Sequence, residues 1–204
     1  MDAIIASLAQ GGWTNDALAS LLIEPAARAL GDAWLADECS ELDLTIGLSM
    51  LQLAGHAARY HATGTPIARE SRYTVLLATA PGEPHMLGTS MLADQFTDAG
   101  WQVDMAFPDS EEALLNQIGA QRPDAVDIAL SDALRREGSL GRLRDAVAHT
   151  RAVAANYPTV ISVGGRLFAE AAATAASVGA DHARRSSVGS IVPIAALVRR
   201  RHAE

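Results

Sequence analysis

The sequence predicts an α/β protein with a helical bundle in front of an open, parallel five-stranded sheet that carries helices on both faces. Apolar residues recur at helical spacing up to about residue 62, and short β-branched runs alternate with helical segments after about residue 72. Between the two regions lies "TGTPIARESR", which has the Gly, Pro and charge of a linker. Strands and helices that alternate at this length form parallel sheets joined by right-handed crossovers.

Residues 1–66 are predicted to form a helical cap domain of three or four helices. Thr14 or Asn15 is a suitable N-cap for the segment that follows, and Pro25 is expected to break or kink that segment. A long amphipathic helix is expected over residues 40–62. The apolar residues at helical spacing are Ile4, Ile5, Leu8, Leu18, Leu21, Leu22, Ala29, Leu44, Leu48, Leu51 and Ala54.

Residues 71–204 are predicted to form the α/β domain. Strands are expected at 73–80, 101–107, 124–131 and 159–165, with a short fifth strand within 179–187. Helices are expected at 85–100, 110–121, 138–156, 166–179 and 188–201. This spacing favours the flavodoxin-like (Rossmann-like) strand order 2-1-3-4-5.

Composition excludes several classes of function. The chain has 204 residues, and its 24 acidic and 16 basic residues give a formal charge of -8, which repels a phosphate backbone and argues against direct nucleic-acid binding. A single cysteine excludes an intramolecular disulfide and a thiolate cluster for zinc or iron–sulfur. No basic leader and no apolar run of roughly 18–20 residues is present, so we expect a cytoplasmic protein that is neither exported nor inserted in a membrane.

The loop after the first predicted strand, "PGEPHMLG", is the expected ligand site. In such sheets ligands bind beyond the carboxyl ends of the strands, where the strand order reverses. Glu83 can orient one ring nitrogen of His85 while the other faces a metal, and Gly88 leaves room for a ligand against the following helix. On the residues alone, a competing reading remains open: His85 is a solvent-exposed first-turn residue, and Glu83 interacts with the helix dipole.

Other small-molecule chemistry lacks its usual residues. No Gly-x-Gly-x-x-Gly or Walker loop is present, and Glu83 would repel the phosphate of a flavin mononucleotide bound at the same loop. We find no nucleophile elbow and no paired carboxylates in a plausible cleft. The sequence therefore predicts a binding protein and not an enzyme.

The stretch "EPHMLG" resembles the Asp-x-His-x-x-Gly motif of cobalamin-binding domains such as those of methionine synthase and methylmalonyl-CoA mutase. The resemblance implies that His85 is the lower cobalt ligand, that Glu83 hydrogen-bonds His85, and that Gly88 admits the displaced nucleotide tail. Ser131 and the pair Gly164–Gly165 follow the third and fourth strands, where the family has residues that line this tail. The chain departs from the family at Glu83, where the motif has Asp, and at Ala133, where the family has Leu.

The phrases "GDAWLADECSELDLTIGLSMLQ" and "APGEPHMLGTSMLADQFTDAGW" resemble AerR-type (PpaA-type) antirepressors and SCHIC-domain sensors of purple photosynthetic bacteria. The resemblance implies a light or redox sensor that binds cobalamin and regulates transcription through a PpsR/CrtJ-type repressor. It also implies that Trp34 covers the upper face of the corrin; His56 and His61 are minor candidates for an upper ligand. Two alternatives stay open: a heme-binding redox or gas sensor, and a corrinoid methyl-carrier protein. The oligomeric state also stays open.

Overall fold

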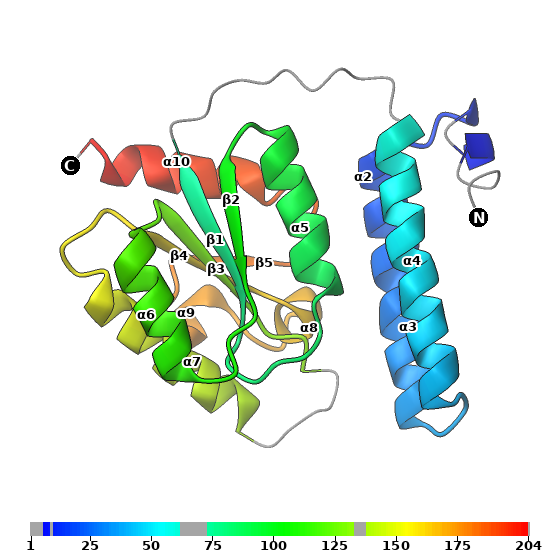
Figure 1. The fold of residues 1–204 in the computed structure, drawn as a ribbon, viewed down its shortest axis with the longest axis horizontal. Coiled ribbons are helices and arrows are strands. Elements are labelled where there is room, and N and C mark those ends of the chain that lie inside the picture. Colours follow the sequence, from blue (N-terminus) through cyan, green and yellow to red (C-terminus); the bar gives the residue numbers. More distant parts are fainter. Residues whose placement is uncertain (1–5, 9, 62–72, 133–137, 204) are drawn as a thin grey trace. The chain divides into compact units, whose positions relative to one another are not determined.

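The structure, a computed structural model, describes residues 6–8, 10–61, 73–132 and 138–203. Contacts divide the chain into two compact units, Met1–Thr65 and Pro66–Glu204, which we call the helical unit and the α/β unit. Figure 1 shows the elements of each unit along the sequence. The linker-like segment "TGTPIARESR" lies outside the described residues.

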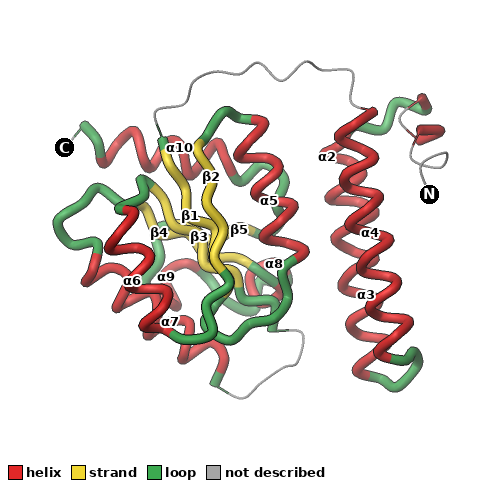
Figure 2. The backbone as a smooth tube through the Cα atoms, viewed as in Figure 1, coloured by secondary structure: helices red, strands yellow, loops and turns green. Residues whose placement is uncertain are grey.

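In the helical unit, a helical segment from residue 15 to residue 35 packs against α4 (Glu41–His61). The first segment consists of α2 (Asn15–Leu18), a π-helical turn η1 (Ala19–Ile23) and α3 (Glu24–Leu35), which follow one another without a gap (Figure 2). Thr14 is the N-cap, because its hydroxyl accepts a hydrogen bond from the Ala17 amide at 3.1 Å. At the start of α4, Ser40 and Asp43 exchange hydrogen bonds between each side chain and the other residue's amide.

The break expected at Pro25 does not occur. Pro25 lies in the first turn of α3, where its missing N–H is tolerated, and the wider π-helical turn directly precedes it. The chain therefore stays helical through the proline.

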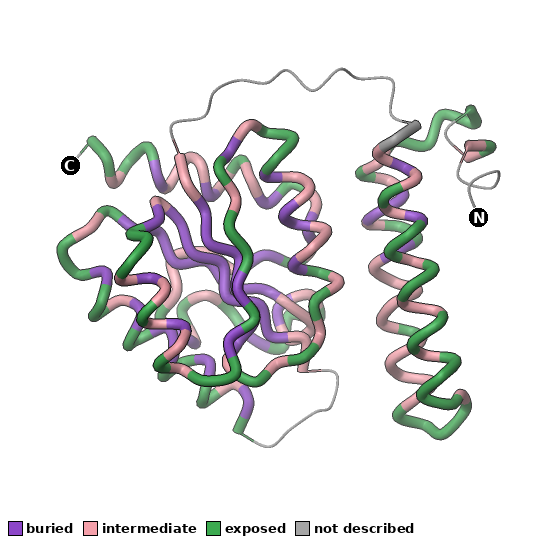
Figure 3. The backbone as a smooth tube through the Cα atoms, viewed as in Figure 1, coloured by how far each residue is buried: buried purple, intermediate pink, exposed green. Residues whose placement is uncertain are grey.

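The α/β unit contains a parallel sheet in the order β2-β1-β3-β4-β5, which confirms the predicted topology. Its strands are β1 (Thr74–Thr79), β2 (Gln102–Ala106), β3 (Ala125–Ala129), β4 (Val160–Gly164) and β5 (His182–Arg184). The residues of β3 and β4 are all buried, as are those of β1 after Thr74, whereas the edge strand β2 is largely exposed. Figure 3 shows this burial concentrated along the strands.

Helices cover both faces of the sheet. They are α5 (Leu87–Asp98), α6 (Glu111–Gln121), α7 (Ser139–Val153), α8 (Arg166–Ala169), α9 (Ala175–Val178) and α10 (Ile191–Arg201). One apolar cluster joins β1, β3 and β4 to α6, α7, α8 and α9. A second cluster joins the opposite face to α5 and α10 through Leu92, Phe96, Ile194 and Val198. We call this second side the α5/α10 face.

One predicted helix is wrong in its extent. Residues 166–179 form two short helices because Ala171, at φ 57°, takes the left-handed conformation and ends the helical run. Thr174 then caps α9 through a capping box with Ser177. In the described part of the chain, no helix combines the length and the apolar character needed to cross a membrane.

Candidate functional site

The strand order reverses between β1 and β3, and the loops that follow these two strands meet at the carboxyl edge of the sheet. The loop after β1 is a tight turn in which the Glu83 amide donates to the Ala80 carbonyl at 2.9 Å. Gly82, at φ 72°, supplies the left-handed conformation that this turn needs. The amide of Gly82 also donates to the Pro108 carbonyl at 2.9 Å, so the loop is held by the segment after β2.

The Glu83 carboxylate accepts three hydrogen bonds from two loops. Its Oε1 accepts from Nδ1 of the His85 ring and from the His85 amide, the latter at 3.1 Å. Its Oε2 accepts from the Asp132 amide, in the loop after β3, at 3.2 Å. The Glu83 side chain is only 8% exposed, so these bonds compete little with water.

Burial by itself raises the pKa of the Glu83 carboxyl. The hydrogen bonds from His85, the coulombic attraction of its ring and the bond from the Asp132 amide outweigh this effect and hold the pKa below its ordinary value. Glu83 is therefore ionised at neutral pH. An ionised carboxylate can only accept hydrogen bonds, so Nδ1 of His85 carries the proton that points at it.

In the neutral form of the His85 ring, the free lone pair consequently lies on Nε2. Nε2 makes no hydrogen bond to any residue in the described part of the chain, and the side chain is 29% exposed. A ring fixed through Nδ1 with an available Nε2 is the usual arrangement of a metal-binding histidine and its carboxylate. The structure thus joins Glu83 and His85 as the sequence predicted, and their role toward a metal stays a prediction.

Gly88 lies in the first turn of α5, and no described residue beyond its own helix turn packs against it. A Cβ atom placed on it would meet no atom within 4 Å. Glycine destabilises a helix by about 0.5–1 kcal/mol relative to alanine, so packing within the unit gives no reason for glycine at this position. Close approach of a ligand to this turn would give one.

The paired glycines after β4 meet two different neighbours. A Cβ on Gly165, which has φ 118°, would lie 1.8 Å from the Leu130 carbonyl oxygen. A Cβ on Gly164 would lie 2.5 Å from side-chain atoms of Arg184. Gly165 is therefore needed for the close approach of the loops after β3 and β4, and Gly164 for the side chain that crosses it.

These features occur on a fold that is known from cobalamin-binding proteins. The monomethylamine corrinoid protein of Methanosarcina barkeri has a TM-score of 0.64 to this chain, at 13% identity over 95% of this chain and 89% of that one. A cobalamin-binding protein from Desulfitobacterium hafniense DCB-2 has a TM-score of 0.53, at 18% identity over 96% of this chain and 90% of that one. The chain has the fold of these cobalamin-binding proteins.

Sequence comparison gives a distant relative. An uncharacterized 20.5 kDa protein in the bchF-crtJ intergenic region of Rhodobacter capsulatus is 28% identical over 166 residues, which are 80% of this chain and 83% of that protein. No family model matches the chain.

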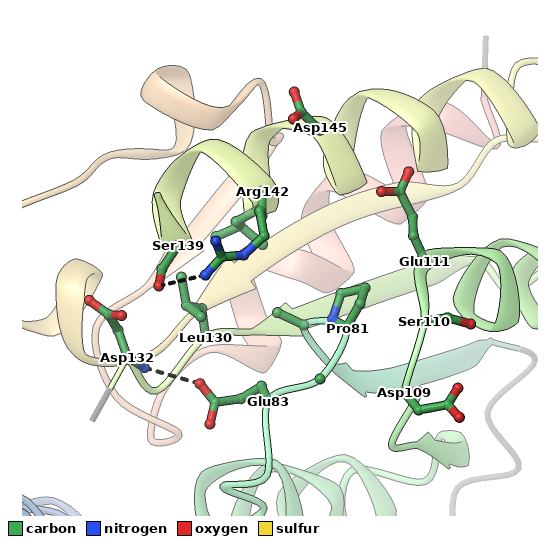
Figure 4. Close-up of a pocket in the computed structure, with 13 residues that line it drawn as sticks. Pro81, Glu83, Asp109, Ser110, Glu111, Leu130, Asp132, Ser139, Arg142 and Asp145 are labelled. Carbon is green, nitrogen blue, oxygen red and sulfur yellow. Dashed lines mark hydrogen bonds between the residues drawn. The ribbon is translucent and has the colours of Figure 1, made fainter. Parts of the chain in front are cut away.

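Within this cobalamin-binding fold, a cavity of about 290 Å³ opens beside Glu83 on the side of α6 and α7. Figure 4 shows Glu83 and Asp132 on one rim of it and Arg142 above Ser139. Of the predicted site residues, Glu83 is the one found among its lining residues. Since Gly164 and Arg184 face the α5/α10 side, this cavity lies on the other face of the sheet from them.

The remaining predicted residues are placed as follows. Ser131 is half-buried directly before Asp132, and its role toward a cofactor is still a prediction. Trp34 is half-buried on α3 in the helical unit, and its role toward a cofactor is still a prediction. His56 is exposed on α4, and the side chain of His61 lies outside the described residues.

Two residues of the site region escaped the sequence prediction. The Asp132 amide depends on a loop conformation with φ 49°, for which the sequence carries no signal. Arg184 pairs with the buried Asp127. An aspartate in the middle of the apolar run "DAVDIALS" was a signal for such a buried partner, because a buried charge needs one.

Proposed function

We propose that this protein is a cobalamin-binding sensor that regulates transcription by binding a repressor protein. The carrying observation is the Glu83–His85 pair at the carboxyl edge of the sheet, where Glu83 fixes the ring and leaves Nε2 available. His85 would bind the cobalt, and Glu83 would orient His85. The fold shared with cobalamin-binding proteins supports this assignment.

The donor set fits a metal that is already held in a macrocycle. No group of three or more His, Cys, Asp or Glu side chains that could bind a metal occurs among the described residues. A single histidine does not hold a bare ion firmly, whereas a corrin brings four nitrogen donors and needs only axial ligands from the protein. When bound, cobalamin would supply a cobalt–ligand bond that light can break.

The buried polar groups also fit a ligand with a polar tail. The hydroxyls of Thr79 at the end of β1 and Thr89 in the first turn of α5 are buried and have no hydrogen-bond partner among the described residues. Buried hydroxyls are normally paired, so two unpaired ones beside the predicted site indicate a partner from outside the chain. Gly88, in the same turn as Thr89, has no side chain that would oppose such a partner.

The regulatory part of the proposal is supported by sequence. The gene of the Rhodobacter capsulatus relative lies between bchF and crtJ, and AerR-type antirepressors, which this chain resembles, act on CrtJ-type repressors. The charge of -8 favours action on DNA through such a partner over direct DNA binding. A change at the cofactor can alter partner binding only if the partner-binding surface differs in free energy between the two states.

Spectroscopy of the reconstituted full chain tests cofactor binding. The protein is loaded with cobalamins or hemin in the dark, and absorption spectra are recorded before and after illumination for wild type, His85→Ala and His149→Ala. His149 is a matched control, because it also contacts a carboxylate, that of Glu111 on α6. Unlike His85, it is exposed on the surface of α7. We expect His85→Ala alone to change the spectrum of bound cobalamin.

Three results would contradict the proposal. A cobalamin spectrum that His85→Ala leaves unchanged would remove the lower ligation, and hemin uptake without cobalamin uptake would favour the heme sensor. Transfer of a methyl group from the loaded protein to a partner enzyme would favour the methyl carrier. The regulatory role is tested separately, by measuring whether the loaded protein releases a CrtJ-type repressor from DNA in a light-dependent way.

A further inference from the structure

A row of small and polar side chains crosses the α5/α10 face at the carboxyl end of the sheet. The strand register aligns Thr79, Ala129, Gly164 and Arg184 across β1, β3, β4 and β5. Side chains two residues apart on a strand share a face, and Leu77, two residues before Thr79, packs with α5 and α10. Between Thr79 and Arg184, the row therefore contains only two small residues, Ala129 and Gly164.

Two buried hydroxyls at this row have no partner. Thr79 is fully buried and Thr89 is 1% exposed, yet neither Oγ1 makes a hydrogen bond within residues 73–132 and 138–203. Thr89 is on the same stripe of α5 as Leu92 and Phe96, which contact this face of the sheet. Both hydroxyls can donate or accept, so a polar group brought in between α5 and the sheet would satisfy them.

Arg184 supplies a buried positive charge at the other end of the row. Its side chain is 6% exposed, and its Nε donates to both oxygens of Asp127, at 2.9 and 3.1 Å. Ser162 donates to the same carboxylate at 2.8 Å. The guanidinium lies against Gly164, where its Cζ and Nε are 2.5 Å from the position that a Cβ would take.

The anchoring of Arg184 leaves much of its donor capacity unused. A guanidinium has five N–H donors, and within the described residues only Nε forms a hydrogen bond. The two terminal nitrogens, which carry the other four donors, are thus held in place beside Gly164 without a partner there. Planar, paired donors of this kind match the oxygens of a phosphate ester.

We propose that Arg184, held by Asp127 beside Gly164, binds the phosphodiester group of the cobalamin nucleotide tail. This inference rests on the proposed function, since cobalamin carries one phosphodiester and that group is its anionic site. The unpaired hydroxyls of Thr79 and Thr89 lie on the same face of the sheet as Arg184, where α5 covers it. Asp127 neutralises the guanidinium when no ligand is bound, which allows a buried arginine to be present in the free protein.

The affinities for cobalamin and cobinamide, measured by absorbance titration of the full chain, test the inference. Cobinamide has the same corrin and cobalt but lacks the nucleotide and its phosphodiester. The main variant is Asp127→Asn combined with Arg184→Gln, which removes both charges and keeps a hydrogen-bonding pair. Arg184→Lys keeps the charge without the paired geometry, and Arg151→Gln is a matched control at the surface Arg151–Asp181 pair. Thermal unfolding identifies any variant that does not fold.

We expect the double variant to bind cobalamin about tenfold to a hundredfold more weakly than wild type and to keep its cobinamide affinity. The cobalamin affinity of Arg184→Lys should lie between those of the double variant and wild type. The affinity of Arg151→Gln should equal that of wild type. If the double variant does not fold, Arg184→Lys must still show a selective loss of cobalamin affinity.

Several outcomes would overturn the inference. Equal losses for both ligands would make Arg184 a structural residue, and unchanged or tighter cobalamin binding by a folded variant would show that it does not bind the tail. Equal binding of both ligands by wild type would reject the tail contact and leave the cofactor assignment intact. Binding of neither ligand by wild type would reject the proposed function together with this inference.

Discussion

The helical unit and the α/β unit use their apolar residues in opposite ways. In the α/β unit, two apolar clusters cover both faces of the sheet, and Leu76, Leu77 and Ile128 are fully buried. In the helical unit, α3 has no buried residue, although apolar residues are regularly spaced along the sequence. Apolar side chains of the helical unit that are exposed are Trp13, Leu21, Leu22, Leu35, Leu42, Ile46, Met50 and Leu53.

The difference follows from geometry. A central sheet has two faces to be covered, and helices on both sides bury nearly all of its side chains. Two packed helices bury one stripe each, so further apolar positions such as Leu42, Ile46 and Leu53 remain on the surface of α4. Burial of apolar side chains within the unit therefore contributes more to the stability of the α/β unit than to that of the helical unit.

The largest expected effect is on core packing. Leu77→Ala in β1 should lower the free energy of unfolding of the α/β unit by about 2–5 kcal/mol, because Leu77 is fully buried. Leu42→Ala on α4 should change the stability of the helical unit by no more than about 0.5 kcal/mol, because Leu42 is 67% exposed. Hydrogen exchange of peptides from each unit, measured in the full chain, reports the two free energies separately. Similar losses of unfolding free energy for Leu77→Ala and Leu42→Ala would contradict this difference between the two units.

The next effect compares two glycines. Gly165→Ala should cost about 1–3 kcal/mol from backbone strain alone, because φ 118° and ψ -170° are nearly restricted to glycine, and the contact with the Leu130 carbonyl adds to it. In the helical unit, the nearest atom to a Cβ on Gly47 is the tip of the Leu30 side chain, at 2.7 Å, which can turn aside. Gly47→Ala should therefore be within about 0.5 kcal/mol of neutral. Urea unfolding of both variants is the test, and a greater loss for Gly47→Ala would reverse the expected order.

A smaller effect of opposite sign is expected at Gly88. Gly88→Ala should stabilise the α/β unit by about 0.5–1 kcal/mol, because alanine is the better helix former and no atom opposes the added methyl group. The same variant should weaken cobalamin binding if Gly88 leaves space for the cofactor. Thermal unfolding without cofactor and titration with cobalamin check the two parts independently. A destabilised variant would show that the glycine is needed for packing.

The smallest effect concerns pH. Burial lowers the pKa of His182 on β5, Asp127 opposes this shift, and Arg184 adds to it. The unfolded chain therefore binds a proton more readily than the folded chain. The contribution to stability is present above the ordinary histidine pKa of about 6.5 and is lost as the pH falls through the folded value. His182→Gln should reduce the slope of unfolding free energy against pH below about pH 6.5, and an unchanged slope would exclude His182 as its source.

Local patterns made the sheet predictable. The strands are β-branched apolar runs bounded by turn residues, and their parallel order follows from the intervening helices. Two local details could not be predicted from the sequence. An alanine-rich segment gives no indication that Ala171 adopts a positive φ, and nothing in the sequence indicates that His182 on the short edge strand β5 is half-buried.

In the candidate site, too, local contacts were predictable from the sequence and contacts between distant segments were not. Glu83 and His85 are two residues apart, so their contact was predictable from the sequence. The Asp132 amide lies 49 residues from Glu83, and Arg184 lies 57 residues from Asp127. Such contacts depend on the register of strands that are distant in the sequence, which patterns of apolar residues define only within one strand.

The three bonds to Glu83 limit how far the motif "PGEPHMLG" can be transplanted. Two of them form within the loop itself, from the amide and the ring of His85. The third comes from the Asp132 amide, which belongs to the loop after β3. A graft of this octapeptide onto another parallel sheet would carry the histidine and its carboxylate and lose one of the two loops that fix the carboxylate. The candidate site is therefore formed by two adjacent strand ends, and no single continuous stretch of the sequence contains it.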